Sequence, residues 1–247
     1  YYSTMSFDAE AQIVRELGKF LKEGSLYRGF KPVLWSTVEK TALADAEVEY
    51  QDHKSDTIYT SFPVKKSNLK ELNGSEIIIW TTTPWTLPSN TALTVGPKID
   101  YVIIQTYNQY TFKPIRVVLA NALVNKQFSG KYFSVNTPAE LKPYNSQSKK
   151  IPYFVEKTII GKSLEGIRYE KIWHESPEPV DYPENAYRVI LGDFVTTEDG
   201  TGIVHTAPTF GAEDAKVAKE ASPEVPPLLI YCLLYTSDAA DEEDSVD

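Results

Sequence analysis

Apolar and polar positions follow two different periods along the chain, which separate a helical beginning from a β-rich remainder. Apolar residues recur at helical spacing between residues 7 and 23, so this segment is predicted to be an amphipathic helix. The residues that carry the pattern, and the glycine placed to end the helix, are Ile13, Leu17, Phe20, Leu21 and Gly24. A glycine turn within residues 27–35 then leads into a short predicted strand.

From residue 57 onward the pattern is typical of β structure. Short segments rich in β-branched residues and bounded by turn residues predict strands at 57–64, 75–83, 101–106, 115–120, 187–191 and 202–206. Helical segments are predicted at 120–128, 138–142 and 212–221, and surface loops at 145–150 and 175–185. Many short strands with few helices predict a β-rich α+β fold whose sheet is closed or nearly closed.

Length and composition narrow the class of protein. The 247 residues allow one large domain, or one domain and part of another. No apolar run approaches the roughly 18 residues of a membrane-spanning helix, so no membrane partner is expected. The single cysteine, Cys232, excludes an internal disulfide framework and a cysteine-based zinc cluster, and it fits a reducing, cytoplasmic location.

The net charge of −9 depends strongly on the end of the chain. Six of the last ten residues are acidic, and removing those six charges from −9 leaves −3 for the remainder. Residues 231–247 are predicted to be a non-native or disordered acidic tail. Several lysines could still meet a phosphate backbone, although a solvated surface is the favoured interpretation of them: Lys65, Lys66, Lys149, Lys150, Lys157 and Lys162.

One segment offers uncharged polar groups for binding. Residues 80–90 read Trp-Thr-Thr-Thr-Pro-Trp-Thr-Leu-Pro-Ser-Asn and directly follow an apolar strand at 77–79. Four threonines, a serine and an amide supply neutral donors and acceptors, which suit a ribose or an ester. Threonine also favours strands and proline often follows one, so a structural role explains these residues equally well.

A second segment, residues 200–214, reads Gly-Thr-Gly-Ile-Val-His-Thr-Ala-Pro-Thr-Phe-Gly-Ala-Glu-Asp. His205 should lie near the end of a strand, and Asp214 in the first turn of a helix, where a carboxylate gains a few tenths to about 1 kcal/mol from the helix dipole. A packed histidine and a dipole-stabilised aspartate are therefore sufficient structural explanations. No Ser-His-acid order, metal-ligand cluster, Walker A loop or G-x-G-x-x-G fingerprint occurs, so the residues alone indicate no nucleophile.

Both segments resemble the pocket peptides of the editing domain of isoleucyl-tRNA synthetases, which are class I aminoacyl-tRNA synthetases. Residues 31–36, Lys-Pro-Val-Leu-Trp-Ser, and 42–50, Ala-Leu-Ala-Asp-Ala-Glu-Val-Glu-Tyr, are similar to the passage from that family's catalytic core into its editing insertion. The likeness extends over residues 1–230 in order. Valyl and leucyl relatives typically carry Thr-Thr-Arg-Pro, whereas Thr83 is here followed by Pro84 and Trp85, which favours the isoleucyl branch.

The resemblance implies a chain of three parts. Residues 1–44 would be a piece of a Rossmann-like catalytic domain, 45–230 a β-barrel-like editing domain (the connective peptide), and 231–247 the tail. It also implies an editing pocket lined by Thr81, Thr82, Thr83, Asn90, His205 and Asp214. Within it Asp214 would hold the substrate's α-ammonium group, and the threonine hydroxyls with nearby backbone amides would orient the ester and the attacking water. His205 would line and gauge the pocket, and no residue is assigned as a general base.

The implied activity is the hydrolysis of valyl-tRNA formed on the isoleucine tRNA, tRNA(Ile), by a double-sieve mechanism. A binding pocket distinguishes two amino acids that differ by one methylene by only about 1–3 kcal/mol, and the isoleucyl-tRNA synthetases are the standard illustration of this limit. The partners would be the acceptor end of tRNA(Ile) carrying valine and the rest of the synthetase. Editing would need no cofactor, with water as the nucleophile.

The parent enzyme attaches isoleucine to tRNA(Ile) with ATP and Mg. The family's His-Ile-Gly-His and Lys-Met-Ser-Lys-Ser ATP-binding signatures are absent from this sequence, so the chain alone is not expected to activate isoleucine. Some relatives carry a Cys-x-x-Cys pair after the tryptophan that matches Trp35. Ser36 and Glu39 stand there instead, and no metal site is expected.

Two alternatives to this interpretation remain. The chain could be the editing domain of a valyl or leucyl relative, or a non-catalytic module that binds tRNA or braces the synthetase.

Overall fold

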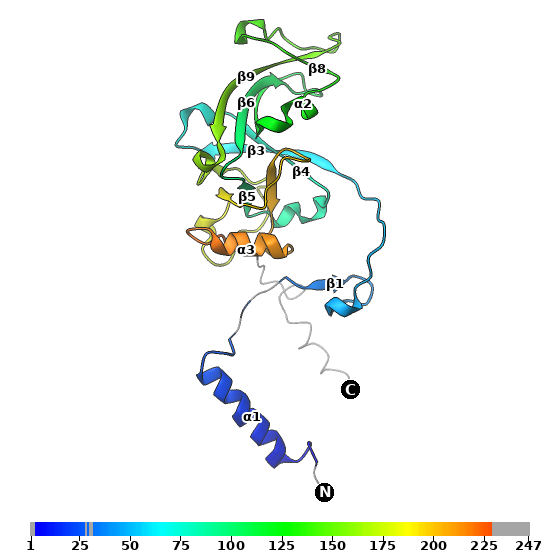
Figure 1. Ribbon diagram of the computed structural model, residues 1–247, viewed down its shortest axis with the longest axis vertical. Helices are drawn as coiled ribbons and strands as arrows, with labels where there is room; N and C mark the ends of the chain where they lie inside the picture. The colour runs from blue at the N-terminus through cyan, green and yellow to red at the C-terminus, as the bar shows by residue number, and fades with distance from the viewer. Residues whose placement is uncertain (1–2, 28, 30–31, 229–247) are drawn as a thin grey trace. The chain divides into compact units, whose positions relative to one another are not determined.

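A computed structural model describes residues 3–27, 29 and 32–228 of the chain (Figure 1). The predicted tail at 231–247 lies outside these residues. The chain divides into two compact units, Tyr1–Lys31 and Pro32–Asp247. The origin of residues 1–44 as a piece of a catalytic domain stays a prediction.

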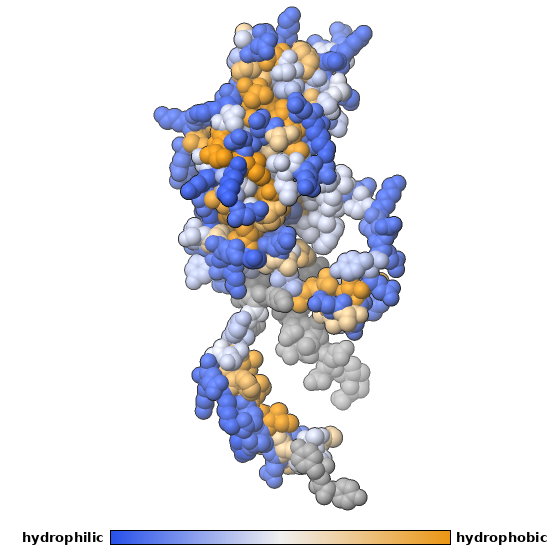
Figure 2. Space-filling model, viewed as in Figure 1, coloured by the Kyte–Doolittle hydropathy of each residue, from blue (hydrophilic) through white to orange (hydrophobic). Residues whose placement is uncertain are grey.

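The first unit contains one helix, α1 (Phe7–Lys22), which confirms the helix predicted at 7–23. Acidic residues in its first turn and lysines in its last turn complement the helix dipole, and Gly24 follows it with a φ of +75°. Figure 2 shows its apolar side chains as a stripe along one side of the helix, with hydrophilic side chains on the other. None of the described helices is long and apolar enough to span a membrane.

The second unit is built from short strands joined by turns and 3₁₀ helices. Its helices are η1 (Asp45–Glu47), η2 (Lys70–Leu72), η3 (Pro84–Ser89), η4 (Asn121–Leu123), α2 (Val124–Gln127), η5 (Pro138–Glu140), η6 (Gly161–Leu164), η7 (Pro183–Asn185) and α3 (Ala212–Glu220). Its strands are β1 (Leu34–Ser36), β2 (Thr41–Leu43), β3 (Ile58–Lys66), β4 (Glu76–Thr81), β5 (Ala92–Val95), β6 (Asp100–Tyr107), β7 (Pro114–Ala120), β8 (Tyr132–Ser134), β9 (Ile151–Ile160), β10 (Arg168–Tyr169), β11 (Arg188–Leu191) and β12 (Ile203–Thr206).

Strands β1 and β2 form a hairpin, and the other described strands form one mixed sheet of ten strands. Its order is β12-β5-β11-β10-β3-β4-β7-β6-β9-β8. The pairs β11–β5, β4–β7 and β8–β9 are parallel, and the remaining neighbours are antiparallel. In Figure 1 helix α3 lies beside β5, at the opposite end of the ten-stranded sheet from β8.

The sheet curls but does not close. Strand β12 packs across β4, and the Ala120 amide at the end of β7 donates to the Thr201 carbonyl just before β12 at 2.8 Å. Strand β4 already pairs with β3 and β7 on its two edges, so β12 can only pack on its face. The predicted β-rich α+β class is confirmed. The sheet curls but does not form the closed barrel that the prediction allowed, because β12 and β8 remain edges of the sheet in the described part of the chain.

Two apolar cores lie on opposite faces of β6. Tyr101 and Ile103 point into the larger cluster, whereas Val102 and Ile104 point into the second, as the period of a strand requires. A third cluster packs α3 onto β5 and β11. Strand β4 follows the same alternation, which leaves Thr81 buried where the strand ends.

The predicted strands and helical segments correspond to β3, β4, β6, β7, β11, β12, the η4–α2 region, η5 and α3. Strands β2, β5, β8, β9 and β10 are missing from the prediction. All four residues of β5 are buried, so the strand shows no alternation that could distinguish it from a loop or a short helix.

The turn before β12 supplies a stability test. Gly202 has a φ of +72°, and a methyl group added there would overlap the Cβ of Ala120. Gly130 has a φ of +63° with nothing within 4 Å of such a methyl group.

Gly202→Ala is expected to lower the free energy of unfolding by about 2–4 kcal/mol, because a left-handed backbone and an overpacked contact both oppose it. Gly130→Ala should cost only about 1–2 kcal/mol. Urea unfolding of both variants measures the difference, and equal losses would contradict the close approach.

Candidate functional site

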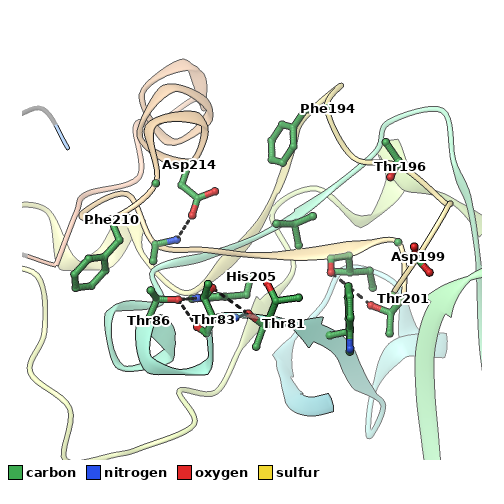
Figure 3. Close-up of a pocket in the computed structure, with 18 of the residues that line it drawn as sticks. Thr81, Thr83, Thr86, Phe194, Thr196, Asp199, Thr201, His205, Phe210 and Asp214 are labelled. Carbon is green, nitrogen blue, oxygen red and sulfur yellow. Dashed lines mark hydrogen bonds between the residues drawn. The ribbon is translucent and has the colours of Figure 1, made fainter. Parts of the chain in front are cut away.

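An open cavity of about 590 Å³ lies between the β4–η3 segment and the β12–α3 segment (Figure 3). Its lining combines residues more than a hundred positions apart in the sequence. Five of the six residues predicted for the site line it: Thr81, Thr82, Thr83, His205 and Asp214.

The threonine segment forms a compact turn at the end of β4. The Thr83 amide donates to the Thr81 hydroxyl at 3.1 Å, and the Thr86 amide donates to the Thr83 carbonyl at 3.1 Å. Pro84 opens helix η3, where its fixed φ is favourable and its missing N–H costs nothing. Thr82 and Thr83 are exposed to the cavity, whereas Thr81 and Thr86 are buried behind them.

Pairing of β12 with β5 brings the second segment to the first. His205 lies opposite Leu93 in this antiparallel ladder. The pair is reinforced by the buried hydroxyls of Thr94 and Thr206, which are 2.6 Å apart. The Thr91 amide also donates to the Thr206 carbonyl, at 3.1 Å.

Asn90 lies behind His205 and does not line the cavity. Its side-chain nitrogen is 2.7 Å from the Ala92 carbonyl and 2.9 Å from Nδ1 of His205. Because a carbonyl oxygen can only accept, the atom facing Ala92 must be the NH₂ group, which fixes the amide orientation. Asn90 therefore acts on the cavity through His205, which differs from the lining role implied by the resemblance.

The same bonds set the tautomer of His205. Its Nδ1 accepts from Asn90, so in the neutral ring the proton is on Nε2, which donates to the Thr86 hydroxyl at 2.9 Å. The Thr86 hydroxyl in turn donates to the Thr83 carbonyl at 2.8 Å. Burial lowers the pKa of His205 from 6.5 to about 4, so the ring is neutral at pH 7. Both ring nitrogens are engaged inside the wall, which leaves neither available to take a proton from a ligand.

Asp214 is the half-buried carboxylate at one end of the cavity (Figure 3). Its Oδ2 accepts from the Ala207 amide at 2.9 Å, and no described residue donates to Oδ1. Burial raises the pKa of Asp214; the Ala207 N–H opposes this, and the charge of Glu213 adds to it. This carboxylate is fixed in position and partly desolvated, and one of its oxygens has no hydrogen-bond donor among the described residues. These properties suit it to bind a cationic group.

Aromatic rings and a second polar group mark the ends of the cavity. Trp85 and Phe210 meet edge to face at 5.4 Å on the side of Asp214, and both remain largely exposed. Thr196, Asp199 and Thr201 lie at the other end in Figure 3. Across the described part of the chain, no group of three or more His, Cys, Asp or Glu side chains could hold a metal ion.

Sequence reasoning missed several residues of this region. Thr86 and Phe210 lie within the two recognised segments but were not singled out. Tyr169, whose hydroxyl donates to Oδ1 of Asn90 at 2.7 Å, lies 79 positions from Asn90 and carries no local signal.

Comparison with known proteins assigns the class. Residues 1–206 match the family described as tRNA synthetases class I (I, L, M and V), so the chain belongs to this family. Within it, the chain is 54% identical over 214 residues to the isoleucine--tRNA ligase of Pelagibacter ubique, covering 87% of this chain and 21% of that protein. It is 46% identical to the isoleucine--tRNA ligase of Bacteroides fragilis, covering 86% of this chain and 18% of that protein. The resemblance to isoleucyl-tRNA synthetases is confirmed, and the chain spans about a fifth of the length of these curated relatives.

Two solved structures show a weaker likeness. One is the leucyl-tRNA synthetase CP1 domain GlLeuRS-CP1, at a TM-score of 0.45 and 16% identity, covering 67% of this chain and 59% of that one. The other is the editing domain of the cytosolic leucyl-tRNA synthetase of P. knowlesi, at a TM-score of 0.45 and 12% identity, covering 72% and 67%. At these values the likeness supports no functional conclusion.

The neutral state of His205 predicts a pH dependence of stability. Its pKa is lowered on folding, so the unfolded chain binds a proton that the folded chain does not, and stability falls as the pH falls from 6.5 towards 4. The wild type should lose roughly 2 kcal/mol more than His205→Gln between pH 7 and pH 5. Urea unfolding of both proteins at the two pH values tests this. The same loss in both would mean that His205 titrates normally.

Proposed function

We propose that this cavity hydrolyses the ester bond of a mischarged aminoacyl-tRNA, with valyl-tRNA(Ile) as its substrate. The observation that carries the proposal is the geometry of Asp214, which presents one unbonded carboxylate oxygen to the cavity. The rest of the lining consists of hydroxyl, backbone, apolar and aromatic groups, with the carboxylates of Glu198 and Asp199. Membership of the class I tRNA synthetases and the similarity to isoleucine--tRNA ligases support the choice of substrate.

Asp214 would bind the α-ammonium group of the aminoacyl ester. The carboxylate is partly desolvated, and an incoming cation offsets this cost while forming a charge-assisted hydrogen bond worth about 1.5–3 kcal/mol. The helix dipole of α3 further favours a negative charge at this position. Binding the amine here would direct the ester towards the threonine turn.

The threonine turn would orient the ester and the attacking water. Thr82 and Thr83 line the cavity and are exposed, and the side chain of Thr82 forms no hydrogen bond to any described residue. Such neutral donors can stabilise the oxyanion that forms at the carbonyl. The water oxygen attacks the ester carbon, the bond from that carbon to the ribose oxygen breaks, and the ribose oxygen takes the water proton. The products are free valine and tRNA(Ile).

His205 would line the cavity rather than act as a general base, because both of its ring nitrogens already have partners. The missing base is instead assigned to the substrate's own terminal ribose hydroxyl. No cofactor is required for this reaction. The acceptor end of tRNA(Ile) and the remainder of a synthetase would be the partners, and charging of tRNA(Ile) with isoleucine by ATP and Mg would belong to that remainder.

Replacement of Asp214 separates its proposed role from a structural one. Asp214→Asn in the 247-residue chain should slow deacylation of valyl-tRNA(Ile) by about 10- to 150-fold, the equivalent of one lost charge-assisted hydrogen bond. Its free energy of unfolding at pH 7 should be unchanged or higher, because the neutral amide avoids the desolvation of the carboxylate. The measurements are the rate of valine release and urea unfolding.

Glu213→Gln is the matched control, since it removes the same charge from the adjacent residue, which does not line this cavity. It should leave deacylation within about twofold, as expected for an exposed charge. Equal losses in both variants would contradict a direct contact of Asp214 with the substrate. A folded wild-type chain that binds tRNA(Ile) but hydrolyses neither valyl nor isoleucyl ester would instead favour the non-catalytic binding or bracing role.

A further inference from the structure

A continuous line of hydrogen bonds leads from the threonine turn into the core of the second unit. Tyr169 donates to Asn90 at 2.7 Å, Asn90 to His205 at 2.9 Å, His205 to Thr86 at 2.9 Å and Thr86 to the Thr83 carbonyl at 2.8 Å. The four side chains are buried, and each donates one bond along the line. Asn90 donates a second bond, to the Ala92 carbonyl, and Tyr169 begins the line as a donor. We call this set the Tyr169 relay.

The direction of the relay follows from its two ends. The Ala92 and Thr83 carbonyls can only accept, so the Asn90 amide and the Thr86 hydroxyl must donate to them. Asn90 then has its oxygen free for Tyr169, and His205 is left with one acceptor and one donor nitrogen. Burial raises the pKa of Tyr169 well above its usual range, so its hydroxyl keeps its proton. Only one arrangement of protons satisfies every group.

Tyr169 is itself held firmly. It lies on β10, opposite Val64 of β3, and its ring packs edge to face on Phe62 with 5.1 Å between centroids and on Tyr187 with 6.4 Å. Its hydroxyl is therefore a fixed donor at the far end of the relay from the cavity. A phenylalanine would keep the ring packing and remove only that donor.

We propose that Tyr169 is a positioning residue of the site, which holds Asn90 so that His205 keeps a single ring orientation in the cavity wall. Without the Tyr169 hydroxyl, the Asn90 oxygen is buried and unpaired, and the amide cannot turn over to satisfy it, because its NH₂ group is held by the Ala92 carbonyl. The amide is then held only through its NH₂ group, so it shifts, and the ring orientation that its bond to Nδ1 of His205 and the bond of Nε2 to Thr86 define is no longer fixed. The shape of the cavity wall is then no longer fixed, so the site distinguishes less well between the side chains of valine and isoleucine.

The link to side-chain discrimination rests on the proposed deacylase function, whereas the tautomer does not. The first experiment therefore reads the tautomer directly, by long-range nitrogen–proton correlation spectra of the 247-residue chain with nitrogen-15-labelled histidine. His205 is one of three histidines, and its signals are assigned by their loss in His205→Gln. The expected result is a protonated Nε2 and a bare Nδ1 in the wild type. A protonated Nδ1 would overturn the proposal without any variant.

The second experiment compares Tyr169→Phe with Thr106→Val. Thr106 is also buried, and its hydroxyl donates to the Pro152 carbonyl at 3.0 Å without lining the cavity. Both variants lose one buried neutral hydrogen bond, so both should lose similar stability. Only Tyr169→Phe should shift the His205 signals, and only it should lower the ratio of valyl to isoleucyl ester hydrolysis, by about tenfold.

A third pair tests the other end of the relay. Thr86→Val removes the partner of Nε2 and should lower the same ratio, whereas Thr86→Ser keeps a hydroxyl and should restore it. If Tyr169→Phe and Thr106→Val both leave the His205 signals and the ratio unchanged, Tyr169 has only a structural role and the proposal fails. If the wild type hydrolyses neither ester, the deacylase function fails, while the tautomer spectra of wild type and Tyr169→Phe still decide the relay.

Discussion

Strand β12 reaches the interior of the second unit by pairing along its whole length with β5, and the cavity exists only because of this ladder. Strand β5 is covered by α3 on one side and belongs to the main core on the other, so its position is determined by apolar packing. The pairing of β12 with β5 then fixes the position of His205, and the turn that follows β12 fixes the position of Asp214. On the other side the turn at Gly202 meets the end of β7, which sets how far β12 can advance across β4.

Burying this ladder also buries the polar side chains of Asn90, His205 and Thr86. Their hydrogen bonds to one another determine the structure of the cavity wall. An unsatisfied buried donor or acceptor costs about 1–3 kcal/mol, so a set of several must be completed as a unit. Asn90, His205 and Thr86 satisfy one another in a line that no single member could complete. His205 is therefore neutral, and both of its ring nitrogens have hydrogen-bond partners. A histidine without these partners at the same position could act as a general acid or base.

Asp214 shows the opposite behaviour. It has one backbone partner, burial raises its pKa, and it keeps an oxygen available to the cavity. His205 and Asp214 are thereby separated by their surroundings: both ring nitrogens of the histidine have hydrogen-bond partners in the wall, whereas the carboxylate keeps one oxygen open to the cavity. The threonine turn adds only neutral donors and acceptors to the same cavity.

Local patterns predicted many of the elements: the amphipathic helix α1, most strands of the sheet and the helix that carries Asp214 were readable from residue spacing and turn residues. The importance of the threonine segment and of Asp214 came instead from their resemblance to a known family. The tertiary structure alone decided how they act. Strand β5 was hidden because burial on both faces removes alternation, and the curl of the sheet depends on which strand edges are already occupied. Asn90 meets His205 across 115 positions and Tyr169 across 79. Hydrogen-bond partners so distant leave no periodic trace in a sequence, because they are chosen by packing after the chain has folded.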